Sequence, residues 1–223
     1  MNYISVAIDG PAGAGKSSVS KAAAQSLGFT YIDTGAMYRA AALFAIENGI
    51  DIRNDRETLI NRLEEVKIVI RYTDKGQRVY LNGRDVSERI REEDVSIGAS
   101  DVAVIQEVRD KLVALQRKMA RSANVIMDGR DICTYVLPNA QVKIFLTASA
   151  ESRAQRRYEQ LKEKGEECDL QKIREDMEYR DKNDSERAVA PLKKADDAVL
   201  VDTTELNFEQ SVEKIKELIK NVL

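Results

Sequence analysis

The feature that most constrains this chain is a glycine-rich turn that directly follows a short apolar run near the start of the sequence. Ile4, Val6 and Ile8 lie in the apolar run, which ends at Asp9. The next eight residues, GPAGAGKS, match the pattern GxxxxGK[ST] without a mismatch. Glycines let a backbone turn its N–H groups inward, and a following helix adds unpaired N–H donors and partial positive charge. The segment therefore predicts a strand, a phosphate-binding loop (P-loop) and a helix over residues 17–27.

Two side chains of this motif suit the phosphates of a nucleoside triphosphate. Lys16 can reach the β- and γ-phosphates as a point charge, and the Ser17 hydroxyl can ligate the Mg²⁺ that bridges them. The alternative is a chance match in an ordinary strand-turn-helix, which eight matched residues in the right place disfavour. The residues predicted to bind the triphosphate are Gly10, Pro11, Ala12, Gly13, Ala14, Gly15, Lys16, Ser17 and Ser18.

The amino-acid composition excludes several kinds of catalytic group and binding partner. The 223-residue chain has 35 basic and 38 acidic residues, so its net charge of −3 attracts neither nucleic acid nor an anionic membrane. It has no histidine, which excludes a histidine base or metal ligand. Cys133 and Cys168 lie far apart and outside any CxxC pattern, which favours a reducing, cytoplasmic compartment. No membrane span or obvious exposed apolar stripe is visible, so we expect a monomer without a membrane partner.

Four further apolar segments have the length of buried strands, and helical segments separate them. Alternating strands and helices predict an α/β fold with a five-stranded parallel sheet that helices cover on both faces. The four segments are residues 29–32, 125–127, 142–146 and 197–201.

Residues 59–96 have a different pattern, which we interpret as a small antiparallel insert that covers the site. Apolar and polar residues alternate over 66–72, a second short strand covers 78–81, and Asn82-Gly83 is a strong hairpin signal. An edge extension of the main sheet is the alternative. One long amphipathic helix is expected over residues 100–121, with its apolar stripe in the core.

Charged residues directly after two predicted strands are candidates for ligand contacts, because ligands bind at the carboxyl ends of parallel strands. The segment DTGAMYR, which ends at Arg39, starts where one strand ends, and DGRD follows another. Arg130 can meet a phosphate, and Asp131 can accept hydrogen bonds from an amine. The alternatives are a solvated helix charge for Arg39 and a structural salt bridge for Arg130 and Asp131.

A predicted helix after Ser149 carries Arg153, Arg156 and Arg157 on one face. Three like charges repel one another unless an anion or acidic neighbours lie against them. We interpret the helix as a lid that brings guanidinium groups over a transferring phosphate and excludes water, with Gly165 as the hinge. A solvated helix face is the alternative, because several glutamates follow.

Four segments taken together resemble the bacterial cytidylate kinase family of P-loop nucleoside monophosphate kinases. They are GPAGAGKS, DTGAMYR, DGRD, and the polar run of residues 180–187 with the AVAPL that follows it. The resemblance spans essentially the whole chain and implies a P-loop kinase fold that transfers the γ-phosphoryl of ATP to CMP or dCMP with Mg²⁺. It also implies a core at residues 1–58 and 97–223, a lid at about 150–170, and a monophosphate-binding insert at 59–96.

The resemblance further implies roles for single residues. Lys16 and Ser17 match the ATP-phosphate and Mg²⁺ site. Other residues match family positions that contact the acceptor nucleotide. Arg39 and Arg130 match positions at its phosphate, and Thr34, Arg109 and Asp131 match positions at its cytosine edge. Ser100, Arg180 and Asp184 match positions at its sugar, and Arg187 matches a position near its phosphate. The residues implied in catalysis are Lys16, Arg130, Arg187 and, from the lid, Arg153 and Arg157.

Two competing functions stay open on the residues alone. Another small-molecule P-loop kinase, acting on UMP, AMP, shikimate or dephospho-coenzyme A, would share the fold, but the insert and the pairing of Asp131 with Arg109 favour cytosine. A nucleotide-dependent switch usually has an apolar strand that ends in a metal-ligating Asp, which residues 125–128 imitate. An arginine-rich lid is better suited to excluding water than to using it.

Overall fold

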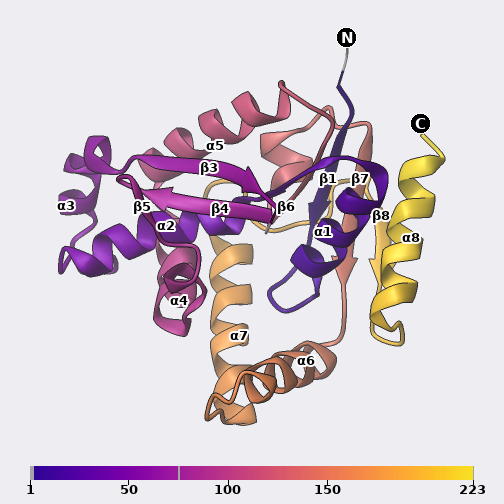
Figure 1. The fold of residues 1–223 in the computed structure, drawn as a ribbon. Helices are drawn as coiled ribbons and strands as arrows, with labels where there is room; N and C mark the ends of the chain where they lie inside the picture. The colour runs from indigo at the N-terminus through magenta and orange to yellow at the C-terminus, as the bar shows by residue number, and fades with distance from the viewer. Residues whose placement is uncertain (1–2, 75, 223) are drawn as a thin grey trace. The chain divides into compact units, whose positions relative to one another are not determined.

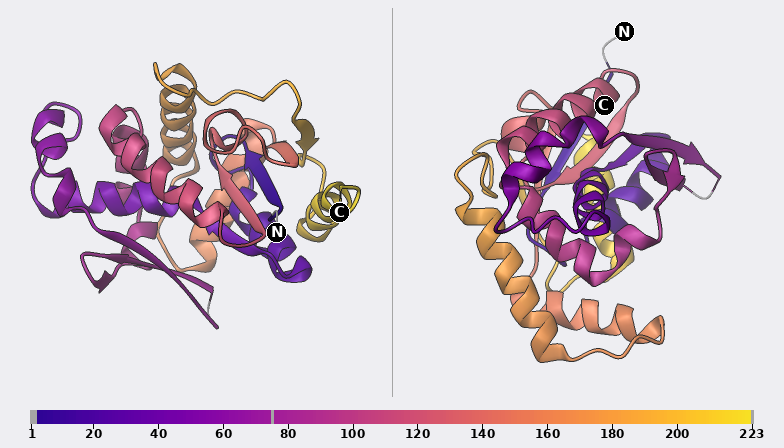
Figure 2. Two further views of the ribbon diagram at one scale, coloured as in Figure 1. Left: turned by 90° about the horizontal axis from the view of Figure 1, so that it is seen from above. Right: turned by 90° about the vertical axis from the view of Figure 1, so that its left-hand side faces the viewer.

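The computed structural model describes residues 3–74 and 76–222 of the chain, shown in Figures 1 and 2. These residues form two compact units: Met1–Ile32 with Ala120–Leu223, here called the core unit, and Asp33–Met119, here called the inserted unit. The predicted insert at 59–96 lies within the sequence of the inserted unit, and its role as a separate subdomain stays a prediction.

A five-stranded parallel sheet forms the centre of the core unit, with the strand order β2-β6-β1-β7-β8. Strand β1 is central, because it pairs with β6 through Ser5 opposite Val125 and with β7 through Val6 opposite Val142. The strands β1 and β6 are almost wholly buried, as expected where both faces of a parallel sheet are covered. The strands are β1 (Ser5–Asp9), β2 (Thr30–Asp33), β6 (Val125–Gly129), β7 (Val142–Thr147) and β8 (Val199–Asp202).

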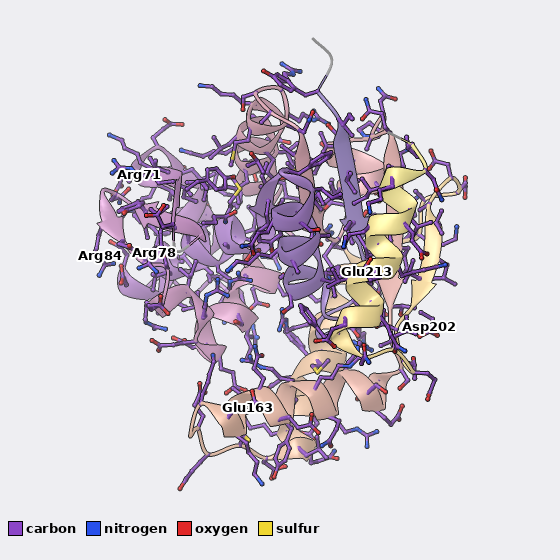
Figure 3. The ribbon with its side chains drawn as sticks, turned by 45° about the vertical axis from the view of Figure 1, so that its right-hand side comes forward. Arg71, Arg78, Arg84, Glu163, Asp202 and Glu213 are labelled. Carbon is purple, nitrogen blue, oxygen red and sulfur yellow. The ribbon has the colours of Figure 1, made fainter. Side chains whose placement is uncertain are left out.

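Two helices, α1 (Lys16–Leu27) and α8 (Phe208–Lys220), lie side by side and pack with the sheet in one apolar cluster (Figure 1). Along α8 the buried residues Ser211, Ile215 and Ile219 recur every four positions, whereas Glu213 lies on the exposed face (Figure 3). This spacing places one stripe of the helix in the core.

A helical hairpin follows β7 and consists of α6 (Ala150–Glu163) and α7 (Leu170–Glu186), with Gly165 in the turn (Figure 1). Ser149 caps α6 by accepting a hydrogen bond from the Ser152 amide (3.1 Å), as its residue type predicts. The two helices pack through a small apolar cluster that includes Ile173 and Met177. A π-helical turn, η3 (Ile132–Val136), follows β6.

The inserted unit combines four helices with a three-stranded antiparallel sheet of order β3-β4-β5. Asn82 and Gly83 both have positive φ, which is the backbone of the hairpin turn that this dipeptide predicts. Side chains of the sheet include Arg71, Arg78 and Arg84 (Figure 3). The elements are α2 (Thr34–Glu47), α3 (Arg56–Asn61), α4 (Glu93–Val102), α5 (Gln106–Ala120), the short 3₁₀ turns η1 (Leu63–Glu65) and η2 (Arg89–Arg91), β3 (Ile68–Thr73), β4 (Gly76–Leu81) and β5 (Arg84–Asp85).

The single helix predicted over residues 100–121 is wrong, because the chain breaks between α4 and α5. Val102, Ala103 and Ile105 are all buried at this break. The Ala103 N–H closes the last turn of α4 on the Ala99 carbonyl (3.2 Å), and the Ile105 N–H then bonds to the Val102 carbonyl three residues back (3.1 Å), so the helical hydrogen-bond pattern ends before α5 begins. The α/β class, the five-stranded parallel sheet flanked by helices and the small antiparallel sheet are confirmed. Over the described residues, none of the helices has the length and apolar character needed to cross a membrane.

Candidate active site

The P-loop connects the end of β1 at Asp9 to the first residue of α1, Lys16. At Gly10, where φ is 153°, an added Cβ would lie 1.9 Å from the Leu146 carbonyl oxygen at the end of β7. Gly13 has a φ of 72°, in the left-handed region that L side chains rarely adopt. These two glycines therefore allow the loop to turn tightly over the carboxyl end of the sheet, as the motif predicts.

Lys16 is folded back onto its own loop. Its Nζ donates a hydrogen bond to the Pro11 carbonyl oxygen (2.7 Å), and the side chain is buried. Burial and the positive charge of Arg130 lower the pKa of Lys16 to about 7. A buried amine in this state gains from a bound anion, because an anion restores the protonated form.

Ser17 and Asp128 form an oxygen pair beside the loop. Ser17 Oγ donates to Asp128 Oδ2 (2.8 Å), and the Tyr31 hydroxyl donates to Asp128 Oδ1 (3.0 Å). A hydroxyl and a carboxylate are hard oxygen donors of the kind that Mg²⁺ prefers. In the described parts of the chain, no group of three or more acidic or cysteine side chains could hold a metal alone. A metal at this pair would therefore take most of its ligands from phosphates and water.

Asp9 fixes the loop that follows β6. It is fully buried and accepts hydrogen bonds from the backbone N–H groups of Ile132 (2.8 Å) and Cys133 (2.7 Å). Burial raises the pKa of Asp9 to about 6. The carboxylate thereby anchors the start of η3, immediately after Arg130 and Asp131. The Cys133 thiol is buried and its pKa is raised mainly by burial, as expected of a structural thiol.

Arg130 pairs with Asp184 of α7 through Nε and Oδ2 (2.7 Å). Burial alone would raise the pKa of Asp184, but the charges of Arg130, Arg180 and Arg187 outweigh it and hold this pKa below its usual value. The carboxylate therefore stays ionised among three guanidinium groups. Guanidinium groups gathered in this way can bind an anion such as a phosphate.

Asp131 pairs with Arg187 (3.0 Å), and both side chains are almost fully buried. Arg187 also donates from Nε (2.8 Å) and Nη2 (2.6 Å) to the carbonyl oxygen of Ala190. Arg130 and Asp131 thus each form a salt bridge with a residue far along the chain, as the structural alternative for these residues allowed. Arg130, Asp131, Arg180, Asp184 and Arg187 all belong to the core unit and four of them are joined in pairs.

Asp33 and Arg39 form an ion pair in the inserted unit, with 2.8 Å between Oδ2 and Nη2. Asp33 also caps α2 by accepting a hydrogen bond from the Ala36 amide (2.9 Å). Burial opposes ionisation, but the Arg39 charge outweighs it and lowers the pKa of Asp33. Arg39 is therefore a held, half-buried group rather than the solvated helix charge that the sequence allowed.

The other predicted residues of the inserted unit are also buried. Arg109 of α5 is fully buried, and its Nη1 donates to the Tyr38 hydroxyl (3.4 Å) and the Ala103 carbonyl (3.5 Å). Thr34 opens α2, and Ser100 lies in α4. Thr34 and Ser100 are buried as well.

The three arginines of α6 do not form one solvated face. Arg153 donates to the Ala12 and Ala148 carbonyls and pairs with Asp181, whereas Arg157 donates to Gln160 (2.8 Å) on the surface. Arg156 donates to the Thr203 side chain (3.1 Å). Arg156 and Arg157 line a cavity of about 540 Å³ beside the P-loop, together with Gly13, Ala14, Gly15, Ser18, Val19, Gln160, Glu163, Thr203, Leu206, Asn207, Phe208 and Ser211.

Several site residues were missed from the sequence. Asp9 and Tyr31 act through contacts to residues more than 90 positions away, which no local pattern signals. Asp128 lies near the end of the buried strand β6, and this position could have identified it as a site residue. The segment 203–208, which lines the cavity, follows the last strand of the sheet. Ligand contacts are expected after any parallel strand, so the same rule would have found it.

A P-loop on the central strand of a parallel sheet places this chain in the class of P-loop proteins. Two solved structures share the fold: a gluconokinase from Sinorhizobium meliloti 1021, with a TM-score of 0.50 and 15% identity over 98% of this chain and 93% of that chain, and a shikimate kinase from Bacteroides thetaiotaomicron, with a TM-score of 0.50 and 16% identity over 97% and 98%. These likenesses concern the fold alone.

Sequence relatives narrow the class further. The family model described as cytidylate kinase matches residues 6–221. A cytidylate kinase of Caldicellulosiruptor bescii is 49% identical over 223 residues, which are 100% of this chain and 98% of the relative. One of Alkaliphilus oremlandii is 50% identical over 222 residues, with 100% of both chains covered. The chain therefore belongs to the cytidylate kinase family, and the resemblance seen in the sequence is confirmed.

Asp9→Asn tests the charge buried at the end of β1. The pKa of Asp9 is about 6 in the folded chain against an ordinary 3.8, so the folded state binds the extra proton between these values. Stability from this group is therefore present below about pH 4 and is lost as the pH rises to about 6, by roughly 3 kcal/mol.

Urea unfolding of both proteins across pH 4 to 7 measures this effect. Subtracting the two free energies of unfolding removes the groups that both proteins share. The wild type should lose stability relative to the Asn variant as the pH rises through this window. A difference that is independent of pH would contradict the assignment.

Proposed function

We propose that this protein transfers the γ-phosphoryl group of ATP to CMP or dCMP, giving CDP or dCDP and ADP, with Mg²⁺ as the metal. The observation that carries the proposal is the set of buried arginine–carboxylate pairs directly after β6, in a chain that is 49% identical to a curated cytidylate kinase. A nucleotide hydrolase needs one phosphate site, whereas a kinase needs a second anion site for its acceptor. Those arginines supply it.

ATP binds at the P-loop in this proposal. The N-terminal N–H groups of α1 and the loop backbone hold the phosphates, as helix N-termini commonly do. Lys16 exchanges the Pro11 carbonyl for phosphate oxygens, which also restores its charge. The nucleoside occupies the cavity beside the loop, where Arg157 offers a planar cation for stacking.

Ser17 and Asp128 are the residues that hold Mg²⁺. Their hydrogen-bonded oxygens fit the ion, and Tyr31 orients the carboxylate from its other oxygen. The metal neutralises phosphate charge when it is bound. The finer assignment to Mg²⁺ rests on the donor types, because this ion favours oxygen and keeps several waters.

CMP contacts residues that the family resemblance assigns. Arg39 and Arg130 bind its phosphate, and Thr34, Arg109 and Asp131 bind the cytosine edge. Ser100, Arg180 and Asp184 bind the sugar, and Arg187 closes near the phosphate. The ionised state of Asp184 among its arginines supports the assignment, because a fixed carboxylate accepts hydrogen bonds from sugar hydroxyls.

The reaction needs no general base. The acceptor phosphate is already ionised, so the protein has to hold it in line with the γ-phosphorus and neutralise charge as it develops. Lys16, Arg130 and Arg187 are suited to the second task, with Arg153 and Arg157 contributed by α6. The lid at about 150–170, the insert at 59–96, a monomeric state and a cytoplasmic location are further parts of this proposal.

Acceptor choice distinguishes this function from those of other small-molecule P-loop kinases. ADP formation from ATP and Mg²⁺ should be strong with CMP and dCMP, and weak with UMP, AMP, shikimate, dephospho-coenzyme A or no acceptor. Lys16→Ala should lower kcat on the order of 10²-fold, because it removes a charge aimed at the transferring group.

Asp131→Asn supplies the matched test of base recognition. It keeps the shape of the side chain beside Arg187 but removes its charge, so the preference for CMP over UMP should fall while the variant melts cooperatively. Preference for a different acceptor would discard the cytosine site. ADP release without any acceptor would favour a nucleotide-dependent switch instead.

Asp128→Asn tests the metal site. The substitution removes one anionic ligand, so the Mg²⁺ concentration at half-maximal activity should rise about tenfold, whereas ATP binding in the presence of EDTA should change little. Asp197→Asn is the control, because Asp197 is exposed and pairs with Lys143 on the surface. An unchanged Mg²⁺ requirement in Asp128→Asn would remove this residue from the metal site.

A further inference from the structure

The peptide group between Pro11 and Ala12 is held at both of its ends. Its carbonyl oxygen, from Pro11, accepts a hydrogen bond from Lys16 Nζ (2.7 Å). Its N–H, from Ala12, donates to Asp181 Oδ1 (3.0 Å). The C=O and N–H of a trans peptide point in opposite directions. A single peptide plane therefore joins the P-loop lysine on one side to a carboxylate of α7 on the other.

The carboxylate is itself held in place by Arg153. Arg153 Nη1 lies 2.6 Å from Asp181 Oδ2 and also donates to the Ala12 carbonyl oxygen (2.8 Å). Its Nε donates to the Ala148 carbonyl oxygen (3.1 Å) just after β7. Both polar groups of Ala12 are thus bound by one ion pair between α6 and α7.

This peptide has a donor at one end and an acceptor at the other. The Lys16 amine on the carbonyl and the Asp181 carboxylate on the N–H polarise the peptide in the same sense, and such hydrogen bonds strengthen one another. Ala12 is only 2% exposed. An N–H this deeply buried is costly to leave without a partner. Loss of the carboxylate would therefore favour rotation of the peptide, and rotation would move the carbonyl that holds Lys16.

Packing points to the same function for the α6–α7 hairpin. A Cβ added to Gly13 would lie 2.4 Å from Met177 Cε and 3.3 Å from Arg153 Cβ, so the hairpin closely abuts the turn of the loop. The hairpin thus supports the P-loop from outside the strand-turn-helix motif that defines it.

We propose that Asp181 is a positioning residue for the ATP-phosphate site, which sets the orientation of the Pro11–Ala12 peptide and, through it, the place of Lys16. This inference rests on the proposed function, since it assumes that the P-loop binds ATP. Asp181 touches no substrate; it prepares the loop before the nucleotide arrives. Preorganisation of this kind lowers the cost of binding.

The alternative is that Asp181 serves only as the ion-pair partner of Arg153. Two substitutions of Asp181 distinguish this alternative from positioning of the peptide. Asp181→Asn removes the charge but keeps an oxygen that can accept from the Ala12 N–H. Asp181→Ala removes both. The matched control is Glu178→Gln, an exposed acidic residue on the same helix.

ATP affinity measured by calorimetry without an acceptor is the main readout. Positioning through the peptide predicts that Kd for ATP rises about tenfold in Asp181→Ala, the equivalent of losing one charged hydrogen bond. It should rise less than about threefold in Asp181→Asn and stay unchanged in Glu178→Gln. Equal losses in the Asn and Ala variants would reduce Asp181 to an ion-pair partner and overturn the proposal.

The Ala12 amide proton supplies a second readout that needs no nucleotide. A hydrogen bond to a carboxylate shifts an amide proton downfield in the NMR spectrum of the ¹⁵N-labelled chain. The signal should move upfield in Asp181→Ala, partly in Asp181→Asn, and stay in place in Glu178→Gln. If Asp181→Ala fails to fold, the spectrum of Asp181→Asn decides. An Ala12 signal in Asp181→Asn identical to that of the wild type would then overturn the proposal.

The two proposals fail in distinguishable ways. A wild-type protein that does not bind ATP would refute the proposed function, whatever the spectrum shows. A wild-type protein that binds ATP while Asp181→Ala binds it equally well would refute only the role of Asp181.

Discussion

Burial of charge at the carboxyl ends of β1 and β6 is the constraint on which the rest of this core unit depends. Asp9, Lys16 and Asp128 are each less than 10% exposed, and charges removed from water need partners. Asp9 is satisfied by two backbone N–H groups, and Asp128 accepts from two hydroxyls. Within the described residues, Lys16 donates its hydrogen bond to a neutral carbonyl, so a phosphate in its place would stabilise the charged amine. The loop geometry and the chemistry follow from the same requirement.

The same logic separates the two anion sites that the proposed function assigns to the molecule, the P-loop and the arginines after β6. At the P-loop, backbone N–H groups and one lysine surround the space for phosphates, so binding depends on how exactly the loop is shaped. After β6, guanidinium groups are already neutralised in part by Asp131 and Asp184. A phosphate that binds there must displace these ion pairs or fit beside them. Such a site therefore contributes more to discrimination between ligands than to affinity. Donor and acceptor sites are thus built from different physical elements.

The sequence predicts the parts whose cause is local. Gly10 and Gly13 reveal the loop because backbone shape requires glycine, and Asn82-Gly83 reveals its hairpin for the same reason. Long-range partners have no such signal: Ala12 and Asp181 are 169 positions apart, and residues 180–187 resemble an ordinary polar surface by composition. The break before α5 was missed because residues 103–105 include no glycine or proline that would signal the end of a helix. Arg39, Arg130 and Asp131 were signalled by their positions after predicted strands, whereas the other acceptor residues came from the family resemblance alone.

The most direct test of the central claim follows the phosphoryl group itself. The protein is incubated with Mg²⁺, CMP and ATP labelled in the γ-phosphate with ³²P, and the products are separated. We expect the label to appear in CDP, in step with ADP, with little inorganic phosphate formed. Label that accumulates as inorganic phosphate at the same rate with and without CMP would contradict it, because the buried arginines after β6 would then not be serving an acceptor.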